Sequence, residues 1–145
     1  RLKAEARRSF GQGSEAQALY QGLLRTDYEA EAHHGLGLLY AGSDLKTAVW
    51  QLQQAVERRP ADGEMRNDLG YALMMSGSYD EALPHLATAA ELDPDGNRRR
   101  NNLILLLLLT HDDAGAKRLA DQSSISADAF AALRKQAATF KPRKV

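Results

Sequence analysis

The most apolar part of the chain is the run Leu103–Leu109, in which seven consecutive residues are hydrophobic. At about 100° per residue such a run covers the whole circumference of a helix, whereas a helix at a protein surface keeps a polar stripe toward water. The run is also much shorter than the roughly 20 apolar residues that span a bilayer. The run therefore predicts a helix and raises the question of what covers the side of it that should face water.

A repeat organises the rest of the chain. Ala48, Ala82 and Ala116 recur at one constant interval. Pro60 and Pro94 have the same separation, and a proline there ends a helix because it cannot continue one. Between the apolar stretches lie turns rich in Gly and Ser. Small residues recur where two helices must approach closely, at Gly37, Ala48, Gly70 and Ala82. The pattern predicts stacked helical hairpins.

This unit resembles the tetratricopeptide repeat, a hairpin of two helices with an L-G…Y…A…F…P pattern and a period of about 34 residues. The best-preserved copy matches it at Leu69, Gly70, Ala82, Leu86 and Pro94. The large aromatic residue of the first helix is missing, and its place is taken by His33, Arg66 and Arg100. The resemblance implies an all-α protein, a right-handed solenoid of helix–turn–helix repeats. The predicted units are a partial first repeat over 1–28 and repeats over 29–62, 63–96 and 97–123.

The pattern changes after Ser123. Residues 124–140 are predicted to form a C-terminal capping helix, with Ser126 as its N-cap and Asp128 in its first turn. A solenoid needs such a terminal element to close its core. The apolar stripe that would do so consists of Phe130, Leu133, Ala137 and Phe140. The basic tail 141–145 could contact phosphate or lipid headgroups, but a solvated end is the favoured interpretation.

The first helix of each tetratricopeptide repeat lines a concave inner face, and this resemblance defines a candidate binding groove. Its predicted residues are mostly apolar: Leu38, Tyr71, Met74, Met75, Leu105, Leu108 and Leu109. The same helices contribute three polar residues one turn earlier, His34, Asn67 and Asn101. Seven apolar anchors of roughly 1.5–3 kcal/mol each can exceed an association cost of about 4–15 kcal/mol. We therefore favour a partner protein that lays an amphipathic helix in this groove. The alternative is that the C-terminal helix folds back over it.

Composition excludes several other functions. The chain has 19 basic and 19 acidic residues, so it is a poor general binder of nucleic acid, and it has no cysteine for a thiolate metal site. The sequence contains no phosphate loop or nucleophile motif. His33 and His34 are adjacent, point about 100° apart on a helix and cannot easily share a metal. The pair Asp80-Glu81 is interpreted as the start of a helix. We expect no catalysis, metal or cofactor.

The run Arg98–Arg100 begins a predicted helix, where cations oppose the helix dipole. One interpretation is that these arginines bind an acidic patch on a partner. The favoured interpretation is that Asp93 and Asp95, which lie nearby in the sequence, neutralise them.

The stretch 67–116 is also similar to the TadD proteins, tetratricopeptide lipoproteins of bacterial tight-adherence pilus systems. The shared features are a D-L-G-Y-A-L helix, then E-L-D-P, then an R-x-N-N-L start to a leucine-rich repeat. This resemblance implies a pilotin, which binds the secretin subunit at the periplasmic face of the outer membrane. The resemblance implies a lipoprotein, whose signal peptide and lipid-attachment cysteine would lie upstream of Arg1. The alternatives are a cytoplasmic chaperone or adaptor and a regulatory domain of a larger enzyme.

Overall fold

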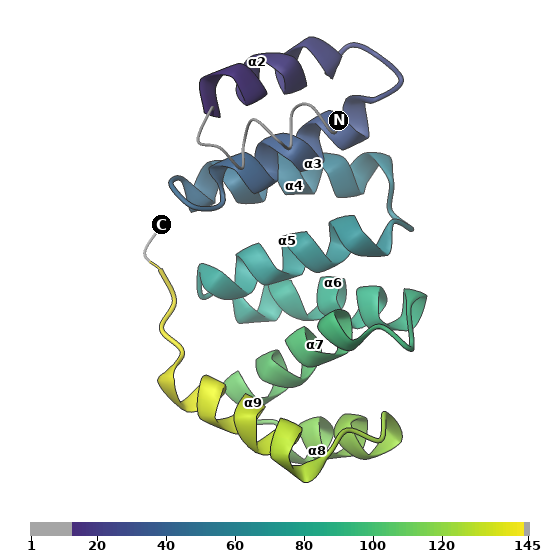
Figure 1. Ribbon diagram of the computed structural model, residues 1–145, viewed down its shortest axis with the longest axis vertical. Coiled ribbons are helices and arrows are strands. Elements are labelled where there is room, and N and C mark those ends of the chain that lie inside the picture. The colour runs from purple at the N-terminus through teal and green to yellow at the C-terminus, as the bar shows by residue number, and fades with distance from the viewer. Residues whose placement is uncertain (1–12, 144–145) are drawn as a thin grey trace.

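The computed structural model describes residues 13–143, and this part of the chain is helical without strands. Its helices follow one another along the axis of a solenoid (Figure 1). Their bounds are α2 Gly13–Leu23, α3 Glu29–Tyr40, α4 Leu45–Arg58, α5 Gly63–Met75, α6 Tyr79–Leu92, α7 Asn97–Leu109, α8 Asp113–Gln122 and α9 Ala127–Thr139.

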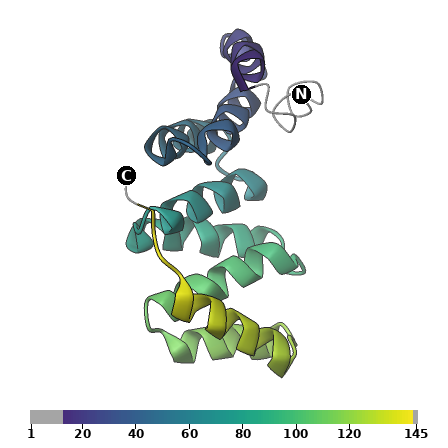
Figure 2. The same cartoon turned by 60° about the vertical axis from the view of Figure 1, so that its left-hand side comes forward.

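The helices form hairpins that stack in chain order. The predicted repeats 29–62, 63–96 and 97–123 each contain one pair, α3–α4, α5–α6 and α7–α8. The two helices of a pair pack on each other, and the second helix packs on the first helix of the next pair. Figure 2 shows the hairpins one above the other. The predicted all-α solenoid is confirmed. Residues 1–12 of the predicted partial repeat lie outside the described residues.

Side-chain caps begin four of these helices. In each, a side-chain oxygen of the residue before the helix accepts a hydrogen bond from the N–H three residues later, which satisfies a free donor of the first turn. The caps are Asp44, Asp62, Asp112 and Ser126, with N···O distances of 3.1, 3.0, 2.9 and 3.0 Å. The Thr47 hydroxyl also donates to Asp44, and these bonds hold the pKa of that carboxyl below its ordinary value. The predicted cap at Ser126 is confirmed.

The two helices of a hairpin approach most closely at glycine. A Cβ on Gly37 would lie 2.5 Å from Cγ of Leu52, and a Cβ on Gly70 would lie 2.6 Å from Cγ of Leu86. Only a residue without a side chain permits these separations. The prediction that small residues mark close helix contacts is confirmed at both positions.

The apolar run of α7 is covered over most of its circumference. Its buried residues are Ile104, Leu105, Leu106 and Leu108. Ile104 and Leu108 cluster with Leu133 of α9, whereas Leu105 and Leu106 belong to a central cluster with residues of α4, α5 and α6. No helix between residues 13 and 143 is both long enough and apolar enough to cross a membrane.

Residues 140–143, here called the closing segment, run back from the C-terminal end toward the middle of the solenoid. After α9, which packs on α7, the chain leaves the last hairpin and passes α5 (Figures 1 and 2, yellow). The ring of Phe140 lies 6.4 Å from that of Tyr79, and the N–H of Arg143 donates to the carbonyl of Met75 at 2.8 Å. The side chains of residues 141–143 are exposed, as expected for a solvated tail, although the backbone of Arg143 is tied to α5. Residues 144–145 lie outside the described residues.

His85 on α6 makes the stability of the α5–α6 hairpin sensitive to pH. Its Nδ1 lies 3.4 Å from a guanidinium nitrogen of Arg66. Burial lowers the pKa of His85 below its ordinary 6.5, and the charge of Arg66 lowers it further, against the smaller opposing effect of Glu81. As the pH falls below 6.5, the unfolded chain takes up this proton before the folded chain does. The stability contribution is therefore complete above that pH and is lost on acidification.

We expect the free energy of unfolding in urea to fall more between about pH 7.5 and about pH 5 in the wild type than in His85→Gln. The matched control is His111→Gln, which changes an exposed histidine in a turn and should keep the wild-type pH dependence. Equal pH dependence in His85→Gln and the wild type would contradict the assignment.

Candidate partner-binding face

The first helices of the hairpins, α3, α5 and α7, carry all ten residues of the predicted groove. Five of them are buried: His34, Asn67, Met74, Leu105 and Leu108. Four are partly exposed: Leu38, Met75, Asn101 and Leu109. Of the ten, Tyr71 alone is exposed, with 40% of its surface accessible. The predicted groove is therefore not an open apolar trough along its whole length.

The apolar wall at α7 is covered by the protein itself. Ala137 and Phe140 pack against the cluster that contains Met74 and Leu105, and Leu108 clusters with α9. The open surface predicted at these three groove residues is corrected, because their side chains form part of the core. At this end of the molecule the structure agrees with the alternative given above, in which the C-terminal helix folds back over the groove. An internal helix buries the apolar wall without the entropy cost of association.

Two polar residues of the predicted groove have partners inside the protein. Nε2 of His34 lies 2.7 Å from Oδ2 of Asp68, so α3 is joined to α5. Nδ2 of Asn102 donates to Oδ1 of Asn67 at 3.1 Å, so α7 is joined to α5. Buried polar groups are stable when they are hydrogen-bonded in this way. Both bonds hold neighbouring first helices in register.

Asp68 is a residue that the sequence analysis did not single out. It is 7% exposed, and its second oxygen, Oδ1, accepts a hydrogen bond from Arg98 at 3.0 Å. The interpretation that Asp93 and Asp95 neutralise Arg98 is corrected, because its carboxylate partner lies on the preceding first helix. The signal in the sequence is that His34 and Asp68 are separated by one full repeat, which places them at equivalent positions of adjacent hairpins.

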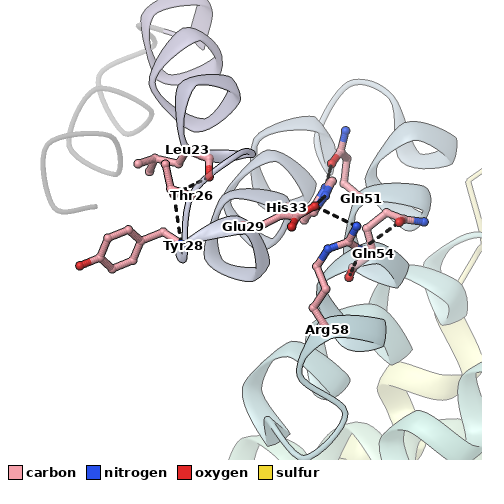
Figure 3. Close-up of polar contacts among 8 residues, drawn as sticks. All are labelled: Leu23, Thr26, Tyr28, Glu29, His33, Gln51, Gln54 and Arg58. Atoms are coloured by element: carbon pink, nitrogen blue, oxygen red, sulfur yellow. Dashed lines mark hydrogen bonds and ion pairs between the residues drawn. The ribbon is translucent and has the colours of Figure 1, made fainter.

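His33 points toward α4, away from the histidine that follows it. Its Nδ1 lies 2.7 Å from Oε1 of Gln51, and its Nε2 lies 3.8 Å from the carboxylate of Glu29. Figure 3 shows these contacts together with Arg58, whose guanidinium lies 2.9 Å from the same carboxylate. The prediction that His33 and His34 diverge is confirmed. These contacts join α3 to α4 within one hairpin.

His34, Glu64 and Asp68 bring ligand-type atoms within 4.8 Å of one another, a grouping found once among the described residues. Glu64 is exposed, and the other two are buried. The guanidinium of Arg98 already contacts Asp68, and its positive charge opposes a metal ion at the same place. The carboxylates of this cluster attract a positively charged side chain, as the contact between Arg98 and Asp68 shows.

The open inner face consists of Glu31 and Leu38 on α3 and of Glu64 and Tyr71 on α5. The members of each pair are seven residues apart, which is about two helical turns, so they lie on one side of their helix. One oxygen of Glu31 lies 2.7 Å from Arg59, and the other is buried without a hydrogen-bond partner. This face combines an exposed aromatic side chain with carboxylates.

Comparison with known proteins identifies the repeat and gives relatives of the chain. Residues 38–97 match the family model described as Tetratricopeptide repeat. The TPR repeat-containing protein PA4299 of Pseudomonas aeruginosa is 39% identical over 113 residues, which are 77% of this chain and 46% of that protein. The chain thus spans about half the length of this curated relative. The repeats predicted from the regular spacing of alanine and proline are confirmed.

Solved structures share the fold. PilF of Pseudomonas aeruginosa has a TM-score of 0.78 at 22% identity, over 94% of this chain and 64% of that one. A mutant of the O-GlcNAc transferase of Thermobaculum terrenum has a TM-score of 0.65 at 27% identity, over 73% of this chain and 21% of that one. A mutant of MamA has a TM-score of 0.62 at 22% identity, over 83% of this chain and 90% of that one. The likeness to PilF and MamA concerns the fold.

Proposed function

We propose that this tetratricopeptide repeat protein is a non-enzymatic binding module that holds a segment of a partner protein on its open inner face. Tyr71 carries the proposal. It is a large aromatic side chain in the middle of α5, 40% exposed, although the neighbouring residues Ala72, Leu73 and Met74 are buried. Tyrosine is enriched at the centres of protein interfaces because it offers a rigid apolar surface together with a polar end.

The finer proposal is that the partner is the secretin subunit of a tight-adherence pilus system. The similarity of residues 67–116 to the TadD proteins supports it, and so does the shared fold with PilF over 94% of this chain. In this proposal the protein acts as a pilotin at the periplasmic face of the outer membrane, held there by a lipid anchor. The segment bound would be an apolar, amphipathic or C-terminal part of the secretin.

The O-GlcNAc transferase favours a second candidate, a regulatory domain of a larger enzyme. This chain matches 21% of that protein, so the same array of helices occurs there as a part of a longer chain. A cytoplasmic adaptor that holds a client helix is a further form of the same binding function. All three use the open inner face and differ in the partner.

The structure limits the affinity that this face can supply. With Met74, Leu105 and Leu108 in the core, the large apolar groups open to a partner are Tyr71 and the partly exposed Leu38, Met75 and Leu109. Burying each of these adds about 1–3 kcal/mol at most, against an association cost of about 4–15 kcal/mol. The apolar contacts alone give weak binding, so polar contacts must contribute to a stable complex.

We expect Tyr71→Ala to weaken binding of a purified secretin C-terminal segment about tenfold, which corresponds to about 1.4 kcal/mol. Isothermal titration calorimetry measures the affinity, and circular dichroism checks that the fold is kept. The control is Leu83→Ala, which removes an exposed apolar side chain from α6 and should leave binding unchanged. Wild-type affinity in a folded Tyr71→Ala variant would contradict the placement of the site. No binding by the wild type would contradict the secretin proposal.

A further inference from the structure

Charge is unevenly divided along the solenoid. Residues 13–96, which form α2–α6, contain 14 acidic and 5 basic residues, a formal charge of −9. Residues 97–143 contain 9 basic and 4 acidic residues, a formal charge of +5. A region of one sign attracts segments of the opposite sign and repels those of its own. The open inner face lies on α3 and α5, within the acidic part.

The carboxylates of this face belong to a row that crosses the first helices. Glu31, Glu64 and Arg98 lie near the start of α3, α5 and α7, about one repeat apart. The third residue of this row, Arg98, is a cation of the protein itself. It neutralises the carboxylate of Asp68, which it contacts at 3.0 Å. The ion pairs found in residues 13–143 include none to Glu64.

Glu31 leaves a second acceptor in the same row. Its Oε2 is buried without a hydrogen-bond partner, although its Oε1 lies 2.7 Å from Arg59. An unsatisfied buried acceptor carries a desolvation cost that a donor from a ligand removes. Lysine and arginine are such donors, and their bonds to carboxylates are stronger than neutral ones. Glu64 therefore offers its oxygen atoms openly, and Glu31 adds an acceptor that a donor reaches only when its side chain moves.

The closing segment shows the kind of chain that lies beside α5. Phe140 packs near Tyr79, and the N–H of Arg143 donates to the carbonyl of Met75. This segment, F-K-P-R, joins an aromatic residue to basic residues. The segment is held at the C-terminal end of α5 by an aromatic ring and a backbone N–H, and its basic side chains are exposed.

We propose that the open inner face binds a basic amphipathic segment of its partner. Apolar side chains of that segment cover Leu38 and Tyr71, and a lysine or arginine side chain pairs with the exposed Glu64. This inference rests on the proposed function and names the chemistry of the partner. Glu64 lies seven residues before Tyr71, about 10 Å along the helix. The basic and apolar residues of the partner are therefore separated by a similar distance.

The test uses two synthetic helical peptides of equal length, one with leucine and lysine and one with leucine and glutamate. Fluorescence anisotropy measures their binding to the full chain at low and at high salt. We expect the lysine peptide to bind at least tenfold more tightly, and its affinity to fall as salt rises. Glu64→Lys should weaken it about tenfold. The matched control, Glu81→Lys, makes the same change in the first turn of α6 and should alter it less than twofold.

Equal binding of the two peptides would overturn the inference, and so would equal weakening by Glu64→Lys and Glu81→Lys, which would indicate attraction to the whole acidic region. If Tyr71→Ala weakens both peptides while Glu64→Lys weakens neither, the proposed function stands and the inference fails. If Tyr71→Ala changes neither peptide, the placement of the binding face fails.

Two further experiments test other possible occupants of this face, a second copy of the chain and a metal ion. Sedimentation of the chain without peptide detects a second copy, and self-association that Glu64→Lys abolishes would replace the partner by that copy. Zinc chloride in place of the peptide tests the cluster of His34, Glu64 and Asp68. Displacement of the lysine peptide by zinc at equimolar concentration would assign the cluster to a metal and overturn the inference. We expect neither result.

Discussion

The Leu105→Glu variant is expected to lose most of its helical structure. Leu105 is 2% exposed and lies in the central cluster, where a carboxylate would meet neither water nor a cation. Burying an unpaired charge costs about 5 kcal/mol or more, which is comparable to the whole stability of a small domain. Circular dichroism at 222 nm and urea unfolding measure the loss.

Leu83→Glu provides the matched control for this change. Leu83 is 42% exposed on α6, so the same substitution there should change the free energy of unfolding by less than about 0.5 kcal/mol. A folded Leu105→Glu variant with wild-type stability would show that the side chain is open to solvent. That result would restore the longer apolar groove that the sequence predicts.

Gly70→Ala is expected to destabilise the protein by about 1–3 kcal/mol, because the added methyl overpacks a helix contact. The new Cβ would lie 2.6 Å from Cγ of Leu86 and 3.2 Å from its backbone nitrogen. The backbone atom cannot rotate away, so α5 and α6 must separate. Urea unfolding at neutral pH measures the change.

The same substitution at Gly22 should have the opposite sign. Gly22 lies in α2, and a Cβ there would have nothing within 4 Å. Alanine should then stabilise the protein by about 0.5–1 kcal/mol, because it favours the helix and restricts the unfolded chain. Changes of the same sign at Gly22 and Gly70 would show that helix propensity, not the contact with Leu86, decides the result.

The hairpins could be predicted from the sequence because their determinants are local and repeated. Gly37 and Leu52 form one close helix contact, and Gly70 and Leu86 form the equivalent contact in the next repeat. The cap of α9 at Ser126 follows from the same kind of local rule. Each of these features needs only neighbouring residues and the period of the repeat.

The position of the closing segment could not be predicted in this way. Arg143 reaches α5 through its backbone N–H, a group that nearly every residue possesses, and its acceptor Met75 is far away in the sequence, in the hairpin before the last one. The ion-pair partner of Arg98 was equally difficult to predict, because the long arginine side chain can reach several acidic residues. Asp93 and Asp95 lie near Arg98 in the sequence and were candidate partners, but the structure pairs it with Asp68 on another hairpin.

The candidate site was predicted in part for a related reason. The register of the repeat identifies which residues lie on the first helices, but it does not state what covers them. Leu105 and Tyr71 occupy equivalent positions in the repeats, yet α7 is closed by α9 and the segment after it, whereas α5 leaves its tyrosine exposed. The carboxylates of the face were not selected because helix starts are often acidic for structural reasons.

The bond between Arg143 and Met75 has a consequence for how the molecule unfolds. In a simple repeat array each unit touches only its neighbours, so the ends can fray one unit at a time. Here the last residues described by the structure are tied to the hairpin before the last one. Loss of the C-terminal helix must break that tie, so the two hairpins at this end should melt as one cooperative unit. Hydrogen exchange would then give α5 and α9 similar opening free energies, higher than that of α2.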